Sequence, residues 1–195
     1  MERHRNKVDA LISLIEPIIK SGYKIIVWSV YKHEIRLLKS ILEAYFENPE
    51  LVVTFYGDVS PKNRDERIEK FKTDPNCQIF LGHPGAGGAG INLVVTPYMV
   101  TYSCTWDPRH PIQSEARNHR IGTAEMCRQH GVNNCTIYYL QCSNTIDVLI
   151  HQALLVKQKV AEDFYEGIES MGEVDVQSMG GNIVNQILEG KDIEN

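Results

Sequence analysis

The stretch from Gln78 to Gly122 decides the fold of this chain. It begins with the apolar run Gln78-Ile-Phe-Leu-Gly82 and opens into His83-Pro-Gly-Ala-Gly-Gly-Ala-Gly-Ile-Asn-Leu93. It continues with Trp106-Asp-Pro108 and ends in Gln113-Ser-Glu-Ala-Arg-Asn-His-Arg-Ile-Gly122. A glycine-rich turn after a strand lets backbone N–H groups approach a bound anion closely, phosphate above all. Two arginines presented from a helix suit the charge of a phosphoryl group. The stretch therefore predicts both halves of a nucleotide-handling surface.

Short apolar strands and amphipathic helices alternate on both sides of this stretch. The patterns predict helices near residues 8–19, 35–45, 61–71, 111–121 and 145–165, and strands at 25–29, 51–55, 78–81, 99–103 and 136–140. Pro17 is expected to kink or end the first helix. This alternation indicates an α/β fold with a mostly parallel sheet covered by helices on both faces. Because such sheets bind ligands beyond the carboxyl ends of their strands, the glycine turn and the arginine helix should reach the same edge.

Charge divides the chain into a mildly basic part and an acidic tail. The chain has 195 residues, 43% of them hydrophobic, and a net charge of −5. Residues 1–160 hold 19 Lys and Arg against 16 Asp and Glu, whereas residues 161–195 hold one Lys against nine acidic residues. We expect a domain over residues 1–165, which is compatible with a polyanion partner, and a loosely attached acidic tail over 166–195. No apolar run reaches membrane-spanning length, and the N-terminus lacks a signal core, so an intracellular protein is expected.

The five cysteines favour reduced thiols over a disulfide framework. Their number is odd and no paired spacing is evident, as expected in a cytosolic protein. Cys127, His130, Cys135 and Cys142 are conceivable zinc ligands, but their spacing fits no tight knuckle, so no metal site is assigned.

The glycine turn has two competing interpretations besides a plain link between strands. Gly85, Gly87 and Gly90 match the G-x-G-x-x-G fingerprint of dinucleotide-binding folds, but that fingerprint needs a full helix directly afterwards. Here a β-branched run follows, and Pro97 ends it within two turns. A Walker A phosphate loop is excluded, because no Gly-Lys-Ser/Thr follows. Five glycines between residues 82 and 90 are nevertheless more than a plain turn between two strands requires.

Three polar residues share one face of the helix predicted after Pro111. Gln113, Arg117 and Arg120 are spaced by four and then three residues, which aligns them at 3.6 residues per turn. On the spacing alone, an exposed polar face paired with Glu115 or Glu125 is the better explanation. The like charges of Arg117 and Arg120, three residues apart, lower stability unless a bound anion compensates them. This favours a phosphate site. Trp28 and Trp106, at strand ends, are either core residues or platforms on which a base stacks.

Taken in order, these motifs resemble the C-terminal RecA-like lobe of Swi/Snf-type ATPases, in the superfamily-two helicase group. Lys24-Ile-Ile-Val-Trp-Ser29 resembles motif four, and Ala86-Gly-Gly-Ala-Gly-Ile-Asn-Leu93 resembles motif five. Gln113-x3-Arg117-x2-Arg120-Ile-Gly122 resembles motif six. The segment Gly57–Arg64, the element Trp106-Asp-Pro108 and the helix start Thr145-Ile-Asp147 add to the resemblance, which covers residues 7–165.

The resemblance implies a role for each matching residue. In that family the lobe is half of a motor, and ATP binds between it and a first lobe. Arg120 is then the expected arginine finger on the γ-phosphate, supported by Arg117. Gln113, Gly88 and Gly90 would line the nucleotide. Contacts with nucleic acid, most simply duplex DNA, would come from Ser29, Val30, Arg64, His83 and Gly85.

Several departures from the family pattern accompany the resemblance. His83-Pro84-Gly85 stands where the family usually has Ser or Thr before Ala-Gly-Gly, and residues 124–134 resemble an insertion. The chain contains no Walker A sequence and no Asp-Glu-x-His-type motif at a strand end. ATP and Mg²⁺ would therefore bind only together with a first lobe, in the same or a separate chain. The lobe alone should not hydrolyse ATP.

The function predicted from the sequence is the second motor lobe of a nucleic-acid-dependent ATPase or helicase. It would be part of an ATP hydrolase in the cytoplasm or nucleus, and a viral or bacterial source fits equally well. The alternative is a non-catalytic module, derived from such a lobe, that docks nucleic acid or protein. The acidic tail and His83-Pro84 favour that alternative, whereas Gln113, Arg117 and Arg120 favour the motor.

Overall fold

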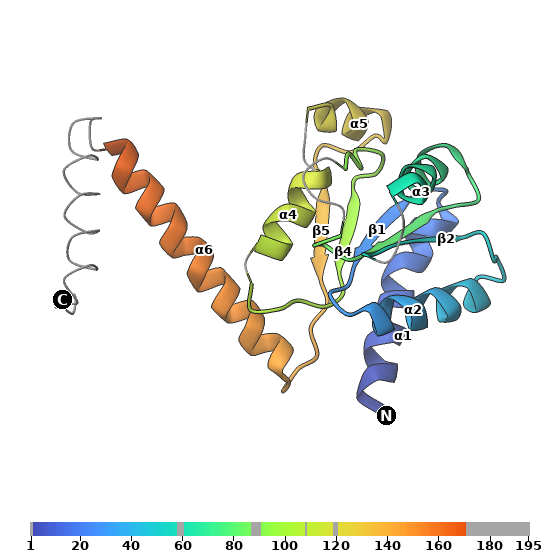
Figure 1. Cartoon of the computed structure of the whole chain (residues 1–195), viewed down its shortest axis with the longest axis horizontal. Helices are drawn as coiled ribbons and strands as arrows, with labels where there is room; N and C mark the ends of the chain where they lie inside the picture. The colour runs from blue at the N-terminus through green and yellow to red at the C-terminus, as the bar shows by residue number, and fades with distance from the viewer. Residues whose placement is uncertain (1, 58–60, 87–90, 108, 119–120, 171–195) are drawn as a thin grey trace. The chain divides into compact units, whose positions relative to one another are not determined.

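The computed structural model describes residues 2–57, 61–86, 91–107, 109–118 and 121–170 (Figure 1). The internal contacts divide the chain into two units, Met1–Gln152 and Ala153–Asn195. The first unit holds a sheet of five strands, all parallel, in the order β2-β3-β1-β4-β5. The strands are β1 (Ile25–Trp28), β2 (Val52–Phe55), β3 (Ile79–Gly82), β4 (Tyr98–Thr101) and β5 (Thr136–Tyr139). The predicted parallel α/β sheet is confirmed.

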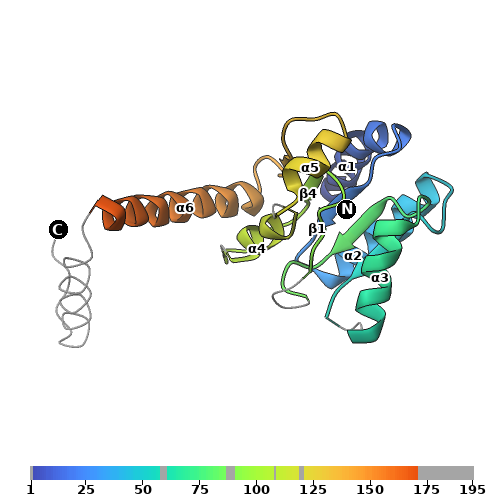
Figure 2. The ribbon, with the colours of Figure 1, turned by 90° about the horizontal axis from the view of Figure 1, so that it is seen from above.

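Helices cover both faces of the sheet. Figure 2 shows α1 and α3 on opposite sides of the strands. The helices of the chain described here are α1 (Glu2–Lys20), α2 (Lys32–Tyr45), α3 (Pro61–Thr73), α4 (Arg109–Asn118), α5 (Thr123–Gln129) and α6 (Ile146–Ser170). The chain moves outward from β1 to β2 and then back to β3. Because crossovers are right-handed, that reversal places α2 and α3 on opposite faces.

Two hydrophobic clusters follow from the period-two alternation of the strands. In β1, Ile25 and Val27 face the cluster that contains the apolar stripes of α1 and α2, whereas Ile26 and Trp28 face the other cluster. The second cluster includes Phe71 of α3 and Phe80 of β3. The central strands are buried on both sides, which explains why their sequences are continuously apolar.

The helices depart from the predicted limits most clearly in α1 and α6, and α5 was not predicted. Helix α1 continues past Pro17 to Lys20, because the buried Ile18 and Ile19 extend its apolar stripe and the Pro17 carbonyl still accepts the N–H of Ser21 (3.1 Å). Helix α5 occupies part of the expected insertion, where its seven residues are too short to show a period. Helix α6 reaches Ser170. The division into a lobe over 1–165 and a tail over 166–195 stays a prediction, and residues 171–195 lie outside the described part.

Gly82 ends β3 where two aromatic rings approach the backbone. A Cβ at this position would lie 2.6 Å from Cζ3 of Trp28 and 2.9 Å from Cε1 of Phe80. Both rings are fully buried and cannot move aside cheaply. We therefore expect Gly82→Ala to lower the free energy of unfolding by about 1–3 kcal/mol through overpacking, as measured by urea denaturation.

Gly57→Ala is the matched control for that substitution. Gly57 is exposed, and a Cβ there would meet nothing within 4 Å. This variant should stay within about 0.5 kcal/mol of the parent protein. Equal effects of the two substitutions would show that the close approach at Gly82 does not limit stability.

Candidate functional site

The carboxyl ends of β1, β3 and β4 bring the predicted functional segments to one edge of the sheet. In the register of the sheet, Trp28 lies beside both Gly82 and Thr101. The segments that follow these residues therefore leave the sheet side by side, as predicted. We call this region the carboxyl edge. Residues 91–97 form no helix, which contradicts the dinucleotide-binding interpretation of the glycine turn.

Arg117 joins α4 to the glycine segment. Its side chain is only 4% exposed, and its guanidinium donates a hydrogen bond to the carbonyl of Ala86 (3.3 Å). The guanidinium also lies 5.3 Å from the ring centroid of Trp28, and the Arg117 carbonyl accepts the N–H of Leu93 (3.0 Å). A buried arginine of this kind holds neighbouring segments in place as well as carrying charge. Its predicted support of a nucleotide site stays a prediction.

The other residues predicted for the nucleotide side are only partly covered by the structure. Gln113 lies in α4, but its side chain is outside the described part. Arg120, Gly88 and Gly90 also lie outside it. Helix α4 spans Arg109–Asn118 and contains Gln113 and Arg117, and the helical face predicted to be shared with Arg120 stays a prediction.

Ser29 and Val30 belong to a buried hydrogen-bond network at the end of β1. The Ser29 hydroxyl donates to Oε2 of Glu34 (2.6 Å), and the Val30 N–H donates to Oγ of Ser103 (3.1 Å). The Ser103 hydroxyl donates to the same Glu34 oxygen (2.6 Å). These polar groups are therefore occupied inside the protein, and a direct contact of Ser29 or Val30 with nucleic acid stays a prediction.

Sequence reasoning missed Glu34 and Ser103. Ser103 lies 74 residues from Ser29 in the chain, and neither Glu34 nor Ser103 belongs to a recognisable motif. The only signal was that Ser29 and Ser103 are each the last residue of a predicted strand, because parallel strand ends meet at one edge.

Arg64 and Gly85 also have partners within the protein. The Arg64 guanidinium donates to the carbonyl of Gly57 (3.2 Å) and lies 5.9 Å from the ring centroid of Phe55. The N–H of Gly85 donates to Nδ1 of the half-buried His83 (2.9 Å). Because that N–H already has an acceptor, a contact of Gly85 with nucleic acid would use its exposed surface. The predicted nucleic-acid contacts of all three residues stay predictions.

The two tryptophans differ sharply in environment. Trp28 is fully buried, and its indole N–H donates to Sδ of Met99 (3.2 Å), so the core interpretation is correct for this residue. Trp106 is 47% exposed at the carboxyl edge, where an indole can meet a ligand. Next to it, Asp107 forms a two-pronged ion pair with Arg109, which holds the pKa of the Asp107 carboxyl well below its usual range.

The cysteines form no metal cluster within the described ranges. Sγ of Cys127 and Sγ of Cys135 lie 3.8 Å apart, while the ring of His130 contacts Tyr23 and the carbonyl of Val95. No group of three or more His, Cys, Asp or Glu side chains could hold an ion in the part that the structure describes. All five cysteines are free thiols.

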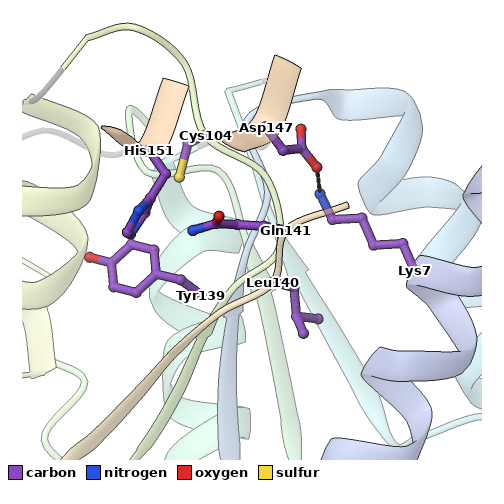
Figure 3. Close-up of a pocket in the computed structure, with 7 residues that line it drawn as sticks. All are labelled: Lys7, Cys104, Tyr139, Leu140, Gln141, Asp147 and His151. Carbon is purple, nitrogen blue, oxygen red and sulfur yellow. Dashed lines mark hydrogen bonds and ion pairs between the residues drawn. The ribbon is translucent and has the colours of Figure 1, made fainter. Parts of the chain in front are cut away.

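A small cavity lies beside the connection from β5 to α6 (Figure 3). Its walls include Lys7, Tyr139, Asp147 and His151, and its volume of about 10 Å³ has room for about one water molecule. Lys7 and Asp147 form an ion pair across it (2.6 Å). Thr145 caps α6 by accepting the N–H of Asp147 (3.2 Å). The cavity is too small for a nucleotide, and its residues anchor the start of α6.

The fold and the carboxyl edge define this unit as a RecA-like α/β lobe. The chain belongs to the family of the helicase conserved C-terminal domain, whose sequence profile matches residues 6–122. It is 28% identical over 138 residues to the human DNA annealing helicase and endonuclease ZRANB3, covering 71% of this chain and 12% of that protein. It is 26% identical over 183 residues to the ATP-dependent helicase fft2 of Schizosaccharomyces pombe, covering 94% of this chain and 13% of that protein.

Solved structures agree with this assignment. The C-terminal part of the Fun30 ATPase domain superposes with a TM-score of 0.63 at 25% identity, covering 76% of this chain and 45% of that one. The SWI2/SNF2 ATPase core of Sulfolobus solfataricus in complex with dsDNA gives a TM-score of 0.62 at 26% identity, covering 80% of this chain and 31% of that one. The predicted Swi/Snf-type RecA-like lobe is therefore confirmed. The chain spans only 12–16% of the length of the first three relatives it matches.

One further finding concerns membranes. Among the described residues, no helix combines the length and the apolar character needed to cross a bilayer.

Proposed function

We propose that this chain is the second motor lobe of a nucleic-acid-dependent ATPase or helicase that acts on duplex DNA inside the cell. One observation carries the proposal: α4 docks on the glycine segment at the carboxyl edge. The Arg117 guanidinium reaches the Ala86 carbonyl, and the Arg117 carbonyl accepts the N–H of Leu93. This docking supports a site in which the residues after α4 and the glycine turn act on one ligand.

The names of the relatives support the nature of the ligands. The fission-yeast relative is an ATP-dependent helicase by name, and the Sulfolobus structure contains dsDNA by its title. Arg120 would stabilise the charge of the transferring γ-phosphate, with Arg117 holding the adjacent segment. The nucleotide would also meet Gln113, Gly88 and Gly90. The DNA would run past the segments of Ser29, Val30, Arg64, His83 and Gly85.

The described residues of the carboxyl edge suit an anion better than a divalent cation. Among them, the Asp107 carboxylate is paired with Arg109, and the Glu34 carboxylate accepts from Ser29 and Ser103. Mg²⁺ prefers carboxylate oxygens that remain open to it and to phosphate. The proposal therefore assigns Mg²⁺ and the phosphate loop to a first lobe, in the same or a separate chain.

ATP turnover with and without duplex DNA tests the proposal. The measurement compares this chain alone, the chain combined with its first lobe, and the full-length protein. We expect no turnover from the chain alone, and DNA-stimulated turnover whenever both lobes are present. The reason is that an arginine finger acts only on a nucleotide held opposite it.

A full-length protein that binds duplex DNA but never hydrolyses ATP would overturn the motor function. The docking module would then be the better description. Turnover by the isolated chain would equally contradict the proposal, because it would require a phosphate loop and a Mg²⁺ site within these residues.

A further inference from the structure

His83 stands where three segments of the carboxyl edge meet. Its Nδ1 accepts the N–H of Gly85 (2.9 Å), at the start of the glycine turn. Its ring contacts the ring of His110 in α4, with centroids 5.7 Å apart and planes at 74°. Its own N–H donates to the carbonyl of Phe55 (2.8 Å), so its backbone is fixed to β2. The ring is thus held between the glycine turn and α4.

Gly85 lies close to both histidine rings. A Cβ at Gly85 would lie 3.1 Å from Cε1 of His83 and 3.6 Å from Nε2 of His110. His110 is fixed in turn, because its Nδ1 lies 3.1 Å from Oγ1 of Thr105. A change in either ring would therefore be felt by the backbone at Gly85.

The contact with Gly85 works only when His83 is neutral. Nδ1 can accept an N–H only if it carries no proton, so the single ring proton must lie on Nε2. Protonation at Nδ1 would set two N–H donors against each other. The added positive charge would also face His110 and Arg117 of α4 and Lys32 of α2.

We propose that His83 is a positioning residue for the nucleic-acid contact: its neutral ring holds the N–H of Gly85 beside α4, and protonation releases that N–H. The inference rests on the proposed function of this edge. It assigns a task to the residue that replaces the usual Ser or Thr at this position. It also makes contact with the phosphate backbone of duplex DNA dependent on pH.

The direction of the pH dependence follows from the surroundings of His83. Burial, together with the charges of His110, Lys32 and Arg117, lowers the pKa of His83, against a raising effect of the Val30 carbonyl. An unfolded histidine has a pKa of about 6.5. The folded state is therefore fully favoured above that pH, loses stability as pH falls below it, and reaches the full penalty below the folded pKa.

Two variants of His83 distinguish the loss of the hydrogen-bond acceptor from the loss of the titratable charge. In His83→Asn, Oδ1 can accept the same N–H two residues on, as Oδ1 of Asn92 does for Val94 (3.0 Å), and asparagine does not titrate. His83→Ala has no acceptor. His33→Asn is the control, because His33 is an exposed histidine at the start of α2 whose ring lies against Tyr31 (5.6 Å).

The first readout needs no DNA. Nuclear magnetic resonance of the 195-residue chain should show His83 as the Nε2–H tautomer, with the Gly85 amide signal shifting as His83 titrates. In His83→Asn the Gly85 amide should keep its position without a shift over the same pH range. If the Gly85 amide signal does not shift as His83 titrates, the proposal is wrong, whether or not the protein hydrolyses ATP.

The second readout is the DNA concentration that half-saturates ATP turnover of the full-length protein. At pH 7.5 we expect His83→Ala to raise it roughly two- to tenfold, the effect of one lost hydrogen bond, and His83→Asn to change it less than twofold. As the pH falls from 7.5 through the midpoint of the His83 titration found by nuclear magnetic resonance, this concentration should rise in the parent protein and in His33→Asn, but stay level in His83→Asn. Parallel pH profiles of the parent protein and His83→Asn would refute the role of His83. A lack of DNA-stimulated turnover at every pH would instead count against the proposed function.

Discussion

Replacing Arg120 by alanine in the full-length protein is expected to lower DNA-stimulated ATP turnover by about three to five orders of magnitude. The guanidinium would stabilise charge that develops on the transferring phosphoryl group, and no neighbouring side chain can replace a positioned finger. The measurement is the turnover rate at saturating ATP and duplex DNA. The affinity for DNA should change little, because the finger acts on the nucleotide.

Arg117→Ala provides the contrast that makes this result interpretable. Arg117 is buried against Trp28 and bonded to the Ala86 carbonyl, so its loss should also lower the free energy of unfolding, by about 1.5–3 kcal/mol. Measuring turnover and the free energy of unfolding for both variants separates a loss of catalysis from a loss of stability. Turnover that survives in Arg120→Ala would mean that this arginine does not reach the γ-phosphate. The non-catalytic docking module would then be the better description of the chain.

Trp28→Ala is expected to have the largest effect on stability, a loss of about 3–5 kcal/mol in the free energy of unfolding. The indole is fully buried, lies 5.8 Å from the ring of Phe80 between centroids, and donates to Met99. Its removal leaves a cavity beneath the carboxyl edge and removes the ring that Arg117 covers. Thermal unfolding should show a melting temperature lower by about 6–20 °C.

Trp106→Ala is the matched control, because it removes the same side chain from a site that is 47% exposed. It should lower the free energy of unfolding clearly less than Trp28→Ala does, because about half of the Trp106 surface is already in contact with water. Similar losses in the two variants would contradict the assignment of Trp28 to the core. With Trp106 removed, the remaining fluorescence reports on Trp28 and should show the short emission wavelength of a buried indole.

Much of the fold was predictable because its signals are local. The apolar runs that form β1 and β3 are buried on both faces of a parallel sheet, and such strands need no alternation of polar residues. The stripe of α1 is buried as its spacing indicates. Helix α5 was not predictable, since seven residues make only about two turns and are too few to establish a period, although Thr123, Met126 and Cys127 are buried.

The candidate site was predictable only in part. The segments that meet at the carboxyl edge follow from parallel strands, whose ends share one side of the sheet. The partners of individual side chains do not follow from that rule. Glu34 joins Ser29 and Ser103, and His83 meets His110, through contacts between segments that lie far apart in the chain.

The sequence by itself determined the alternation of strands and helices apart from α5, the family and the edge at which the motifs gather. These properties follow from the period of apolar residues and from motif spacing, both of which are local along the chain. Only the tertiary structure decided that Arg117 is buried and donates a hydrogen bond to the Ala86 carbonyl, and that Ser29 donates one to Glu34. It alone also decided that His83 accepts the N–H of Gly85. Burial and hydrogen bonding of this kind arise when distant segments exclude water together, and no spacing within one segment can specify them.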